Sequence, residues 1–101
     1  MMLPKGFRIA GPFWTWALDN LGADGITMPW GRVYLRARCA ADAVLIVHEQ
    51  VHLEQIERDG AITFSVRYLW WWWRRGYWLN PYEIEAYTRD GRGYIYEGHA
   101  P

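Results

Sequence analysis

The sequence predicts a small α+β fold, in which a short β-hairpin or small sheet packs on about three helices. Two short runs rich in apolar residues flank a Pro-Trp-Gly turn, a pattern typical of a hairpin. Three later segments are bounded by residue types that begin and end helices. The chain has 101 residues, of which 51% are apolar, so we expect a single domain with a modest core.

The predicted domain has three parts. Residues 1–24 are rich in Gly, Pro and aromatic residues and give little periodic signal, so we expect an irregular arm with a short helix near Thr15–Leu21. Residues 25–91 form the predicted core. Residues 92–101 are a short tail, with one expected strand at Tyr94–Tyr96.

The predicted hairpin joins a strand at Ile26–Met28 to a second strand at Arg32–Ala37. Apolar and polar residues alternate in the second strand. Alternation with a period of two places the apolar side chains on one face, which indicates a half-buried strand.

Two helices are expected to follow the hairpin. Asp42 can cap a helix that runs to about Asp59 and stops at Gly60. Its apolar positions have mixed spacing, so we expect burial on more than one side. The next helix is predicted over Ile62–Arg75 and ends at Gly76.

A third helix is predicted from the sequence Asn80-Pro81. Asparagine is a favoured N-cap, and proline fits the first helical position because its missing N–H needs no partner there. This helix should carry Tyr82–Arg89 and end near Gly91.

Charge and cysteine usage exclude several classes of protein. Eleven basic residues balance eleven acidic ones, so no nucleic-acid partner is expected. Cys39 is the single cysteine, which rules out an intramolecular disulfide. The first residues do not resemble a signal peptide, and no uncharged apolar run approaches the roughly 20 residues of a membrane span. We expect a cytoplasmic protein and leave peripheral membrane association open.

The sequence His48-Glu49-Gln50-Val51-His52 carries the clearest chemical signal. Histidines four residues apart on a helix lie on one face, one turn from each other, and can bind one zinc ion. Glu49 is better placed for a metal-bound water than for the metal, which makes it a candidate general base. The alternative is a helix whose two histidines have no metal-binding role.

A catalytic zinc site needs a third protein ligand. Glu83, in the first turn of the third predicted helix, is the leading candidate. Glu83 could instead complete a capping box with Asn80, which needs no metal. Glu85 is the reserve ligand, and His99 in the tail is a further alternative. Gln55 lies on the histidine face and could line the site or face solvent.

These motifs resemble those of the gluzincin superfamily of zinc peptidases, in which H-E-x-x-H is followed by a Glu ligand on a second helix. The frame N-P-Y-E-x-E-A-Y at 80–87, with Gln55, is similar to a group of small metallopeptidase-like proteins of bacteria and phages. The resemblance covers roughly residues 26–90. It implies a minimal zincin-like core, Zn²⁺ as cofactor and a peptide or protein substrate.

The resemblance also assigns roles. Glu83 matches the metal ligand, beside His48 and His52, and Glu49 matches the general base. The chain departs from the superfamily at Tyr87, where Asp or Asn usually orients a ligand histidine. Tyr87 could instead donate a hydrogen bond to the metal water or to a transition-state oxyanion. In the resembling peptidases an edge strand beside the motif helix pairs with substrate, and Arg32–Ala37 would be that strand.

The run Trp70–Trp73 is the second unusual feature. Consecutive residues on a helix point in all directions, so we expect about half of the four rings in the core and the rest in contact with a protein or a membrane surface. The leading hypothesis is therefore a zinc-dependent peptide-bond hydrolase. The alternative is a non-catalytic zinc-bearing scaffold, or a protein- or membrane-contact module, that uses the Trp-rich helix.

Overall fold

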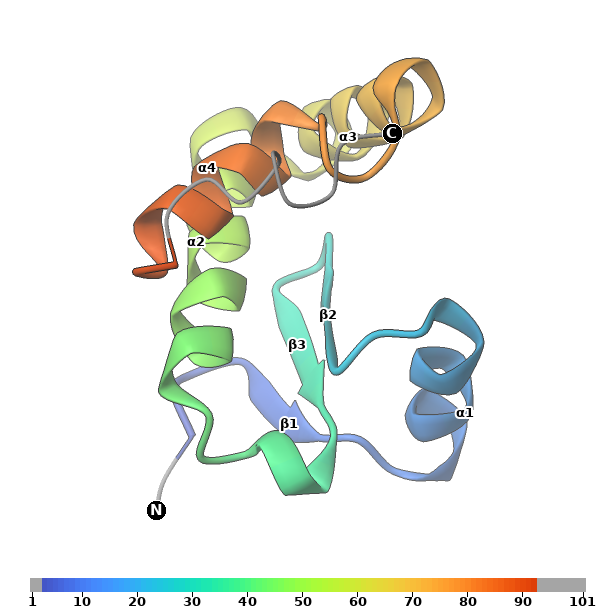
Figure 1. The fold of residues 1–101 in the computed structure, drawn as a ribbon, viewed down its shortest axis with the longest axis vertical. Coiled ribbons are helices and arrows are strands. Elements are labelled where there is room, and N and C mark those ends of the chain that lie inside the picture. Colours follow the sequence, from blue (N-terminus) through green and yellow to red (C-terminus); the bar gives the residue numbers. More distant parts are fainter. Residues whose placement is uncertain (1–2, 93–101) are drawn as a thin grey trace.

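The computed structural model describes residues 3–92 and confirms the predicted α+β class. The sheet has three strands. Figure 1 shows it beside helices that rise above it. The predicted strand at Tyr94–Tyr96 and the side chain of His99 lie outside the described residues. The elements, in chain order, are β1 (Phe7–Ile9), α1 (Pro12–Leu21), β2 (Gly25–Met28), β3 (Arg32–Leu35), a 3₁₀ turn (Ala37–Cys39), α2 (Ala43–Asp59), α3 (Ala61–Arg75) and α4 (Pro81–Arg89).

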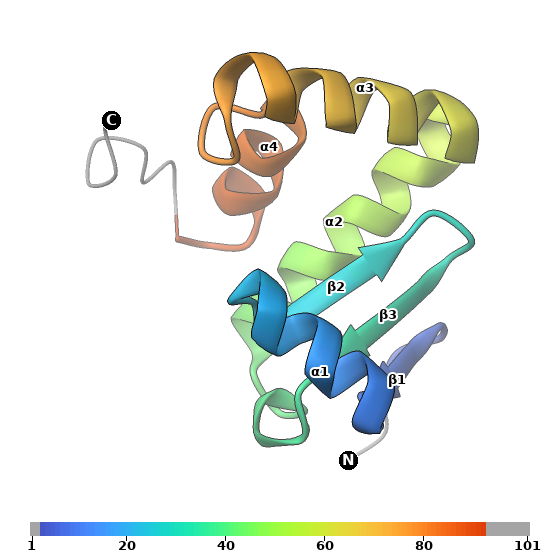
Figure 2. The ribbon, with the colours of Figure 1, turned by 90° about the vertical axis from the view of Figure 1, so that its right-hand side faces the viewer.

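The sheet is mixed, with strand order β1-β3-β2. β2 and β3 form the predicted hairpin, which is antiparallel and pairs Met28 with Arg32 next to the turn. β1 pairs with β3 in parallel, with Phe7 opposite Val33. The right-hand part of Figure 2 shows the three strands side by side.

Two expectations for this part of the chain are wrong. Residues 3–24 are not irregular apart from one short helix, because they also contain β1; the predicted helix near Thr15–Leu21 is present as α1 and begins earlier, at Pro12. The strand Arg32–Leu35 is not an edge strand, because β1 covers one side of it and β2 covers the other. The two edge strands are therefore β1 and β2, and β2 is the one whose Thr27 contacts Glu49. The cause is a parallel pairing between residues 26 positions apart, which a local pattern does not reveal.

The core lies between the sheet and α2. Phe7, Val33 and Leu35 are buried, at 3%, 0% and 0% exposure, as the alternation in β3 predicts. Leu45 and Leu53 of α2, among others, pack against them. Each such side chain contributes about 1.5–3 kcal/mol when fully buried, so this small cluster fixes α2 on the sheet.

The helix boundaries follow local chemistry, as predicted. The Asp42 side chain accepts a hydrogen bond from the Leu45 N–H and caps α2. Gly60, with φ +86°, separates α2 from α3, and Gly76 ends α3 with φ +78°. Both φ values lie in the region that favours glycine. Asn80 caps α4, and Pro81 is its first residue.

α2 is the central element, in contact with β2, α3 and α4. α3 crosses the far end of α2 and extends away from the sheet (Figures 1 and 2). Trp70, Trp72 and Trp73 of α3 are exposed and Trp71 is half-buried, so the expected burial of half of the rings is wrong. Within residues 3–92, no helix combines the length and apolar character that crossing a bilayer requires.

Candidate metal centre

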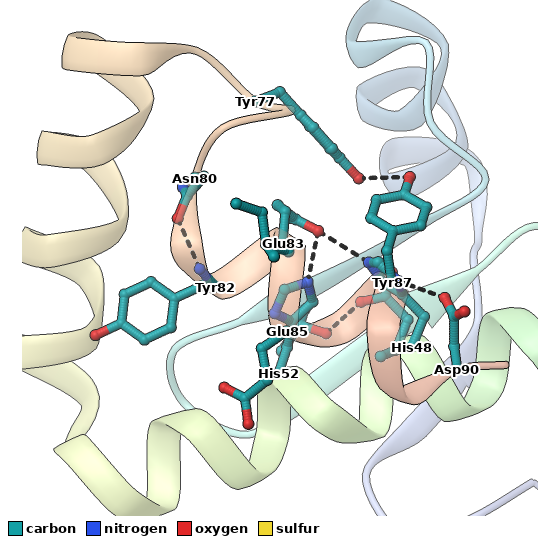
Figure 3. Close-up of polar contacts among 12 residues, drawn as sticks. His48, His52, Tyr77, Asn80, Tyr82, Glu83, Glu85, Tyr87 and Asp90 are labelled. Carbon is teal, nitrogen blue, oxygen red and sulfur yellow. Dashed lines mark hydrogen bonds and ion pairs between the residues drawn. The ribbon is translucent and has the colours of Figure 1, made fainter. Parts of the chain in front are cut away.

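The two histidines of α2 point toward α4 and are almost completely buried. Their rings lie one helical turn apart, with centroids 4.9 Å from each other. His48 is 3% exposed and His52 is 5% exposed. Glu83 comes from the first turn of α4, is 4% exposed, and points back at both rings (Figure 3).

The three side chains converge on one point. Glu83 Oε1 lies 2.9 Å from His48 Nε2 and 3.1 Å from His52 Nε2. One potential ligand atom from each residue lies within 4.8 Å of the other two. Zinc binds histidine nitrogen and carboxylate oxygen at about 2.0–2.2 Å. The cluster therefore has the donor set and the compactness to hold a metal ion.

Glu83 is available for this cluster because the cap of α4 does not use it. The Asn80 side chain accepts from the Tyr82 N–H at 3.0 Å, while the Asn80 N–H donates to the Tyr77 carbonyl. The Glu83 carboxylate takes no part in this cap, so the capping-box alternative is wrong. Glu85 also lies elsewhere, because its carboxylate accepts from Gln55 and pairs with Arg58 and Arg89.

Each histidine has a second contact that fixes its orientation. His48 Nδ1 lies 2.9 Å from the buried Asp90 Oδ2. His52 Nδ1 lies 2.8 Å from Gln55 Oε1. The Gln55 amide nitrogen donates to the Tyr82 carbonyl and to Glu85, so its oxygen is the atom that accepts from His52. The acceptors at both Nδ1 atoms leave both Nε2 atoms facing Glu83, where a metal ion could replace the proton that they carry in its absence.

The sequence indicated Gln55 as a candidate site residue but did not indicate Asp90. Gln55 was singled out with two alternatives, and its complete burial excludes a solvated residue. Asp90 was missed. The resemblance places an orienting carboxylate at position 87, whereas Asp90 lies seven positions after Glu83. The C-terminal end of α4 brings Asp90 next to His48. Arg92 bonds its carboxylate as well, at 2.6 Å.

The second oxygen of Glu83 is also occupied. Tyr68 of α3 donates its hydroxyl to Glu83 Oε2 at 2.5 Å. Burial and the neighbouring Glu83 carboxylate raise the pKa of Tyr68, so the phenol stays protonated and keeps donating. This bond leaves Glu83 Oε1 as the oxygen that faces the histidines. It also ties α3 to the cluster, a role for Tyr68 that sequence reasoning missed.

The electrostatics of the cluster indicate a need for positive charge. Burial by itself lowers the pKa of His52, but the Glu83 carboxylate, together with Glu49 and Gln55, raises that pKa to about 9. Burial opposes ionisation of Glu83, yet His52, His48 and Tyr68 hold its pKa well below the usual range. A buried carboxylate and two imidazole lone pairs repel one another unless a cation lies between them. Protons supply that charge in the absence of metal, and a metal ion supplies it otherwise.

Glu49 lies next to the cluster, on the side of β2. It is 5% exposed, and its Oε2 accepts a hydrogen bond from the Thr27 hydroxyl at 2.5 Å. The backbone of β2 comes close at Gly25, where an added Cβ would lie 3.3 Å from Glu49 Oε1. The carboxylate is therefore held between the face of α2 that carries His48 and His52 and the edge strand β2.

Tyr87 packs on the cluster rather than joining it. Its ring lies against the His48 ring, with centroids 4.5 Å apart, and Arg92 lies over its face. Its hydroxyl is 3.0 Å from the hydroxyl of Tyr77 (Figure 3). Burial raises the pKa of both phenols, so both remain protonated donors.

Comparisons of the chain with known protein families, curated proteins and solved structures find no match. The fold and site define an α+β chain with a buried His-His-Glu cluster that could bind a metal ion. Both histidines have ordered hydrogen-bond partners on their outer nitrogens.

Proposed function

We propose that this chain binds one zinc ion through His48, His52 and Glu83 and hydrolyses peptide bonds, as gluzincins do. The observation that carries the proposal is the convergence of two Nε2 atoms and one carboxylate oxygen in a buried site. Two histidines and a glutamate form a known catalytic zinc set with one open position. Harder ions such as Mg²⁺ and Ca²⁺ prefer oxygen ligands, so the two imidazoles favour zinc.

Zinc, when bound, supplies a Lewis acid that polarises a carbonyl and acidifies water. The protein residues supply the rest. Glu49 is the proposed acceptor of the proton from the attacking water, since it lies beside the ligands without joining them. The Thr27 hydroxyl occupies Glu49 Oε2, which leaves Oε1 for that proton. The hydroxyl pair of Tyr77 and Tyr87 is the proposed donor to the oxyanion.

The free edge of β2 is the proposed site for the substrate backbone. The Arg36 N–H donates to the Asp24 carbonyl, and hydrogen-bonded pairs alternate with open pairs in an antiparallel ladder. The backbone groups of Gly25 and Thr27 therefore point away from β3. An extended peptide that adds to this edge would lie beside Glu49, and this replaces β3 as the proposed substrate strand.

A zinc-bearing scaffold without catalysis is the second candidate. The observation that favours it is burial, because His48, His52 and Glu83 are each no more than 5% exposed. A structural zinc site is usually closed by a fourth protein ligand. Within residues 3–92 the cluster contains three ligating side chains, which favours the catalytic alternative.

The substitution Glu49→Gln separates the two candidates. The peptidase proposal predicts unchanged zinc content and a loss of turnover of about 10²–10⁴-fold, the usual contribution of a general base. Glu57→Gln, on the exposed side of the same helix, is the matched control and should retain activity. Turnover is measured on a library of quenched fluorogenic peptides. A zinc-loaded wild type that cleaves none of them, or a variant with full activity, would leave the scaffold as the better description.

A further inference from the structure

The outer side of α3 exposes a broad apolar surface. We call its six residues the α3 apolar face. Their exposed fractions lie between 52% and 82%, and no other element within residues 3–92 exposes as many large hydrophobic side chains. The six residues are Ile62, Val66, Leu69, Trp70, Trp72 and Trp73.

The face is wide and runs the length of the helix. With 3.6 residues per turn, its side chains cover an arc of about 160° around α3. The opposite side of the helix carries the buried Phe64 and the half-buried Tyr68, which pack toward α2 and α4. α3 is thus apolar on two sides, and residues 3–92 cover only one of them. An exposed apolar surface of this extent marks a contact site.

The charges around the face have one sign. α3 contains three arginines and no acidic residue. Arg67 and Arg74 border one side of the apolar face on a helical wheel, and Arg75 borders the other. Arg74 and Arg75 lie over the rings of Trp70 and Trp71, at 5.7 and 5.1 Å from the centroids. Within residues 3–92, no ion pair joins either guanidinium to a carboxylate.

Two occupants fit an exposed apolar helix, and the geometry distinguishes them. A second helix, from another copy of the chain, covers a narrow seam. The arc of about 160° is wider than such a seam. A helix that lies in a membrane interface has a broad apolar side with tryptophans, bordered by basic residues. The exposed apolar residues of α1 lack this charge pattern, because α1 contains Asp19 and no basic residue.

We propose that α3 docks the chain on an anionic lipid surface, with its axis in the plane of the membrane. The apolar face would enter the boundary between headgroups and acyl chains, and Arg74 and Arg75 would contact lipid phosphates. Docking leaves the inner side of α3 in place, so Tyr68 keeps its bond to Glu83. The inference is independent of catalysis, because none of the docking residues touches the metal cluster.

Co-sedimentation of the full chain with vesicles tests this proposal. We expect binding to vesicles of phosphatidylcholine mixed with phosphatidylglycerol and much weaker binding to phosphatidylcholine alone. Trp73→Glu, at a position 71% exposed, should lower the partition coefficient more than about tenfold. Arg74→Gln with Arg75→Gln should lower it about thirtyfold on the anionic vesicles.

The matched control is Trp16→Glu, which removes another exposed tryptophan, at 61%, from α1. It should bind as the wild type does. Circular dichroism checks that each variant is folded, and Ile62→Glu, at the other end of the face, repeats the test if Trp73→Glu unfolds. Equal binding to neutral and anionic vesicles, or equal losses for Trp16→Glu and Trp73→Glu, would overturn the proposal. So would a dimer in sedimentation equilibrium that Trp73→Glu dissociates, without vesicle binding by the wild type.

Discussion

The interface of α2 with α4 and the outer side of α3 are opposite in character. The first buries two histidines and two carboxylates, and the second exposes aliphatic and tryptophan side chains to solvent. Each reverses the ordinary distribution, in which apolar groups are inside and ionisable groups are outside. Burying charge and exposing apolar surface both cost free energy. The two proposed binding partners differ accordingly: a cation inside, and an apolar, anionic surface outside.

The substitution with the largest expected effect on this contrast is at Glu83. Glu83→Gln removes the charged ligand from between the two imidazoles. Structural zinc sites bind with about 10–16 kcal/mol shared among four ligands, so we expect zinc affinity to fall about a thousandfold. Isothermal titration with zinc measures the effect.

Glu85→Gln is the control for this substitution. It changes a carboxylate two residues away that pairs with Arg58 and Arg89 instead, and zinc affinity should stay unchanged. Undiminished affinity in Glu83→Gln would remove Glu83 from the site and would return attention to Glu85 and His99.

The two sides of α3 give the next largest effect. Phe64→Ala empties a buried position, at 6% exposure, and should lower the free energy of unfolding by about 3–5 kcal/mol. Leu69→Ala, at 61% exposure on the same helix, should change it by less than about 0.5 kcal/mol in the absence of lipid. Urea denaturation compares the two variants. Similar losses would mean that the apolar face is covered in solution.

The pH dependence of stability sharpens the description of the buried region. The raised pKa of His52 contributes stability to the metal-free protein that is complete below its unfolded value of 6.5 and is lost as the pH rises through about 9. The lowered pKa of Glu83 contributes above its unfolded value of 4.5 and is lost as the pH falls below it. The melting temperature should therefore fall between pH 6.5 and 9.

Zinc should act in the opposite direction over the same range. It displaces the proton from His52, so the increase in melting temperature on adding zinc should grow as the pH rises. Thermal melts with and without zinc, between pH 6 and 9, check both trends. A metal-free protein whose stability is flat across this window, or a zinc effect that shrinks, would show that His52 and Glu83 are not coupled as described.

Asp90 tests whether the hydrogen bonds around the cluster matter for the metal. Asp90→Ala removes the acceptor at His48 Nδ1, and loss of such an outer contact lowers metal affinity about 10–100-fold. Asp24→Ala, an exposed carboxylate in salt bridges with Arg36 and Arg38, is the control and should bind zinc normally. If both variants bind zinc equally well, the orientation of His48 comes from packing alone.

The smallest effect is expected at Thr27. Thr27→Val removes the hydroxyl that donates a hydrogen bond to Glu49. A hydrogen bond to a charged group contributes a net free energy of about 1.5–3 kcal/mol at most. We expect peptide turnover to fall severalfold while zinc content stays constant, and Thr27→Ser should restore turnover. A fall in zinc content, or failure of Ser to restore activity, would assign Thr27 a packing role.

Local chemistry predicted most of the helical part of the fold. Asp42, Gly60, Gly76 and Asn80-Pro81 mark helix boundaries that the structure confirms. A capping side chain or a positive φ acts within a few residues, so such signals are visible in the sequence. The same is true of the alternation in β3.

The errors come from contacts between distant parts of the chain. β1 has three residues, too few for a periodic signal, and it makes β3 central through a parallel pairing. The tryptophans were expected to divide between core and surface, but the core is filled by smaller side chains between the sheet and α2. Which face of a helix is covered depends on where its neighbours lie, and α3 has few.

The candidate site divides in the same way. The spacing of His48 and His52 follows from helix geometry. Glu83, the leading candidate for the third ligand, lies beside both histidines in the structure. Asp90 and Tyr68 were not foreseen, because each reaches the cluster from another element. Residues that orient ligands have no spacing rule of their own, so only the fold reveals them.

Anomalous diffraction from crystals of the wild-type protein grown with zinc tests the central claim most directly. We predict one strong peak between His48 Nε2, His52 Nε2 and Glu83 Oε1, at about 2.0–2.2 Å from each atom. The absence of a peak at that position, with zinc in excess and the side chains arranged as in Figure 3, would contradict the claim that this buried cluster is a zinc site.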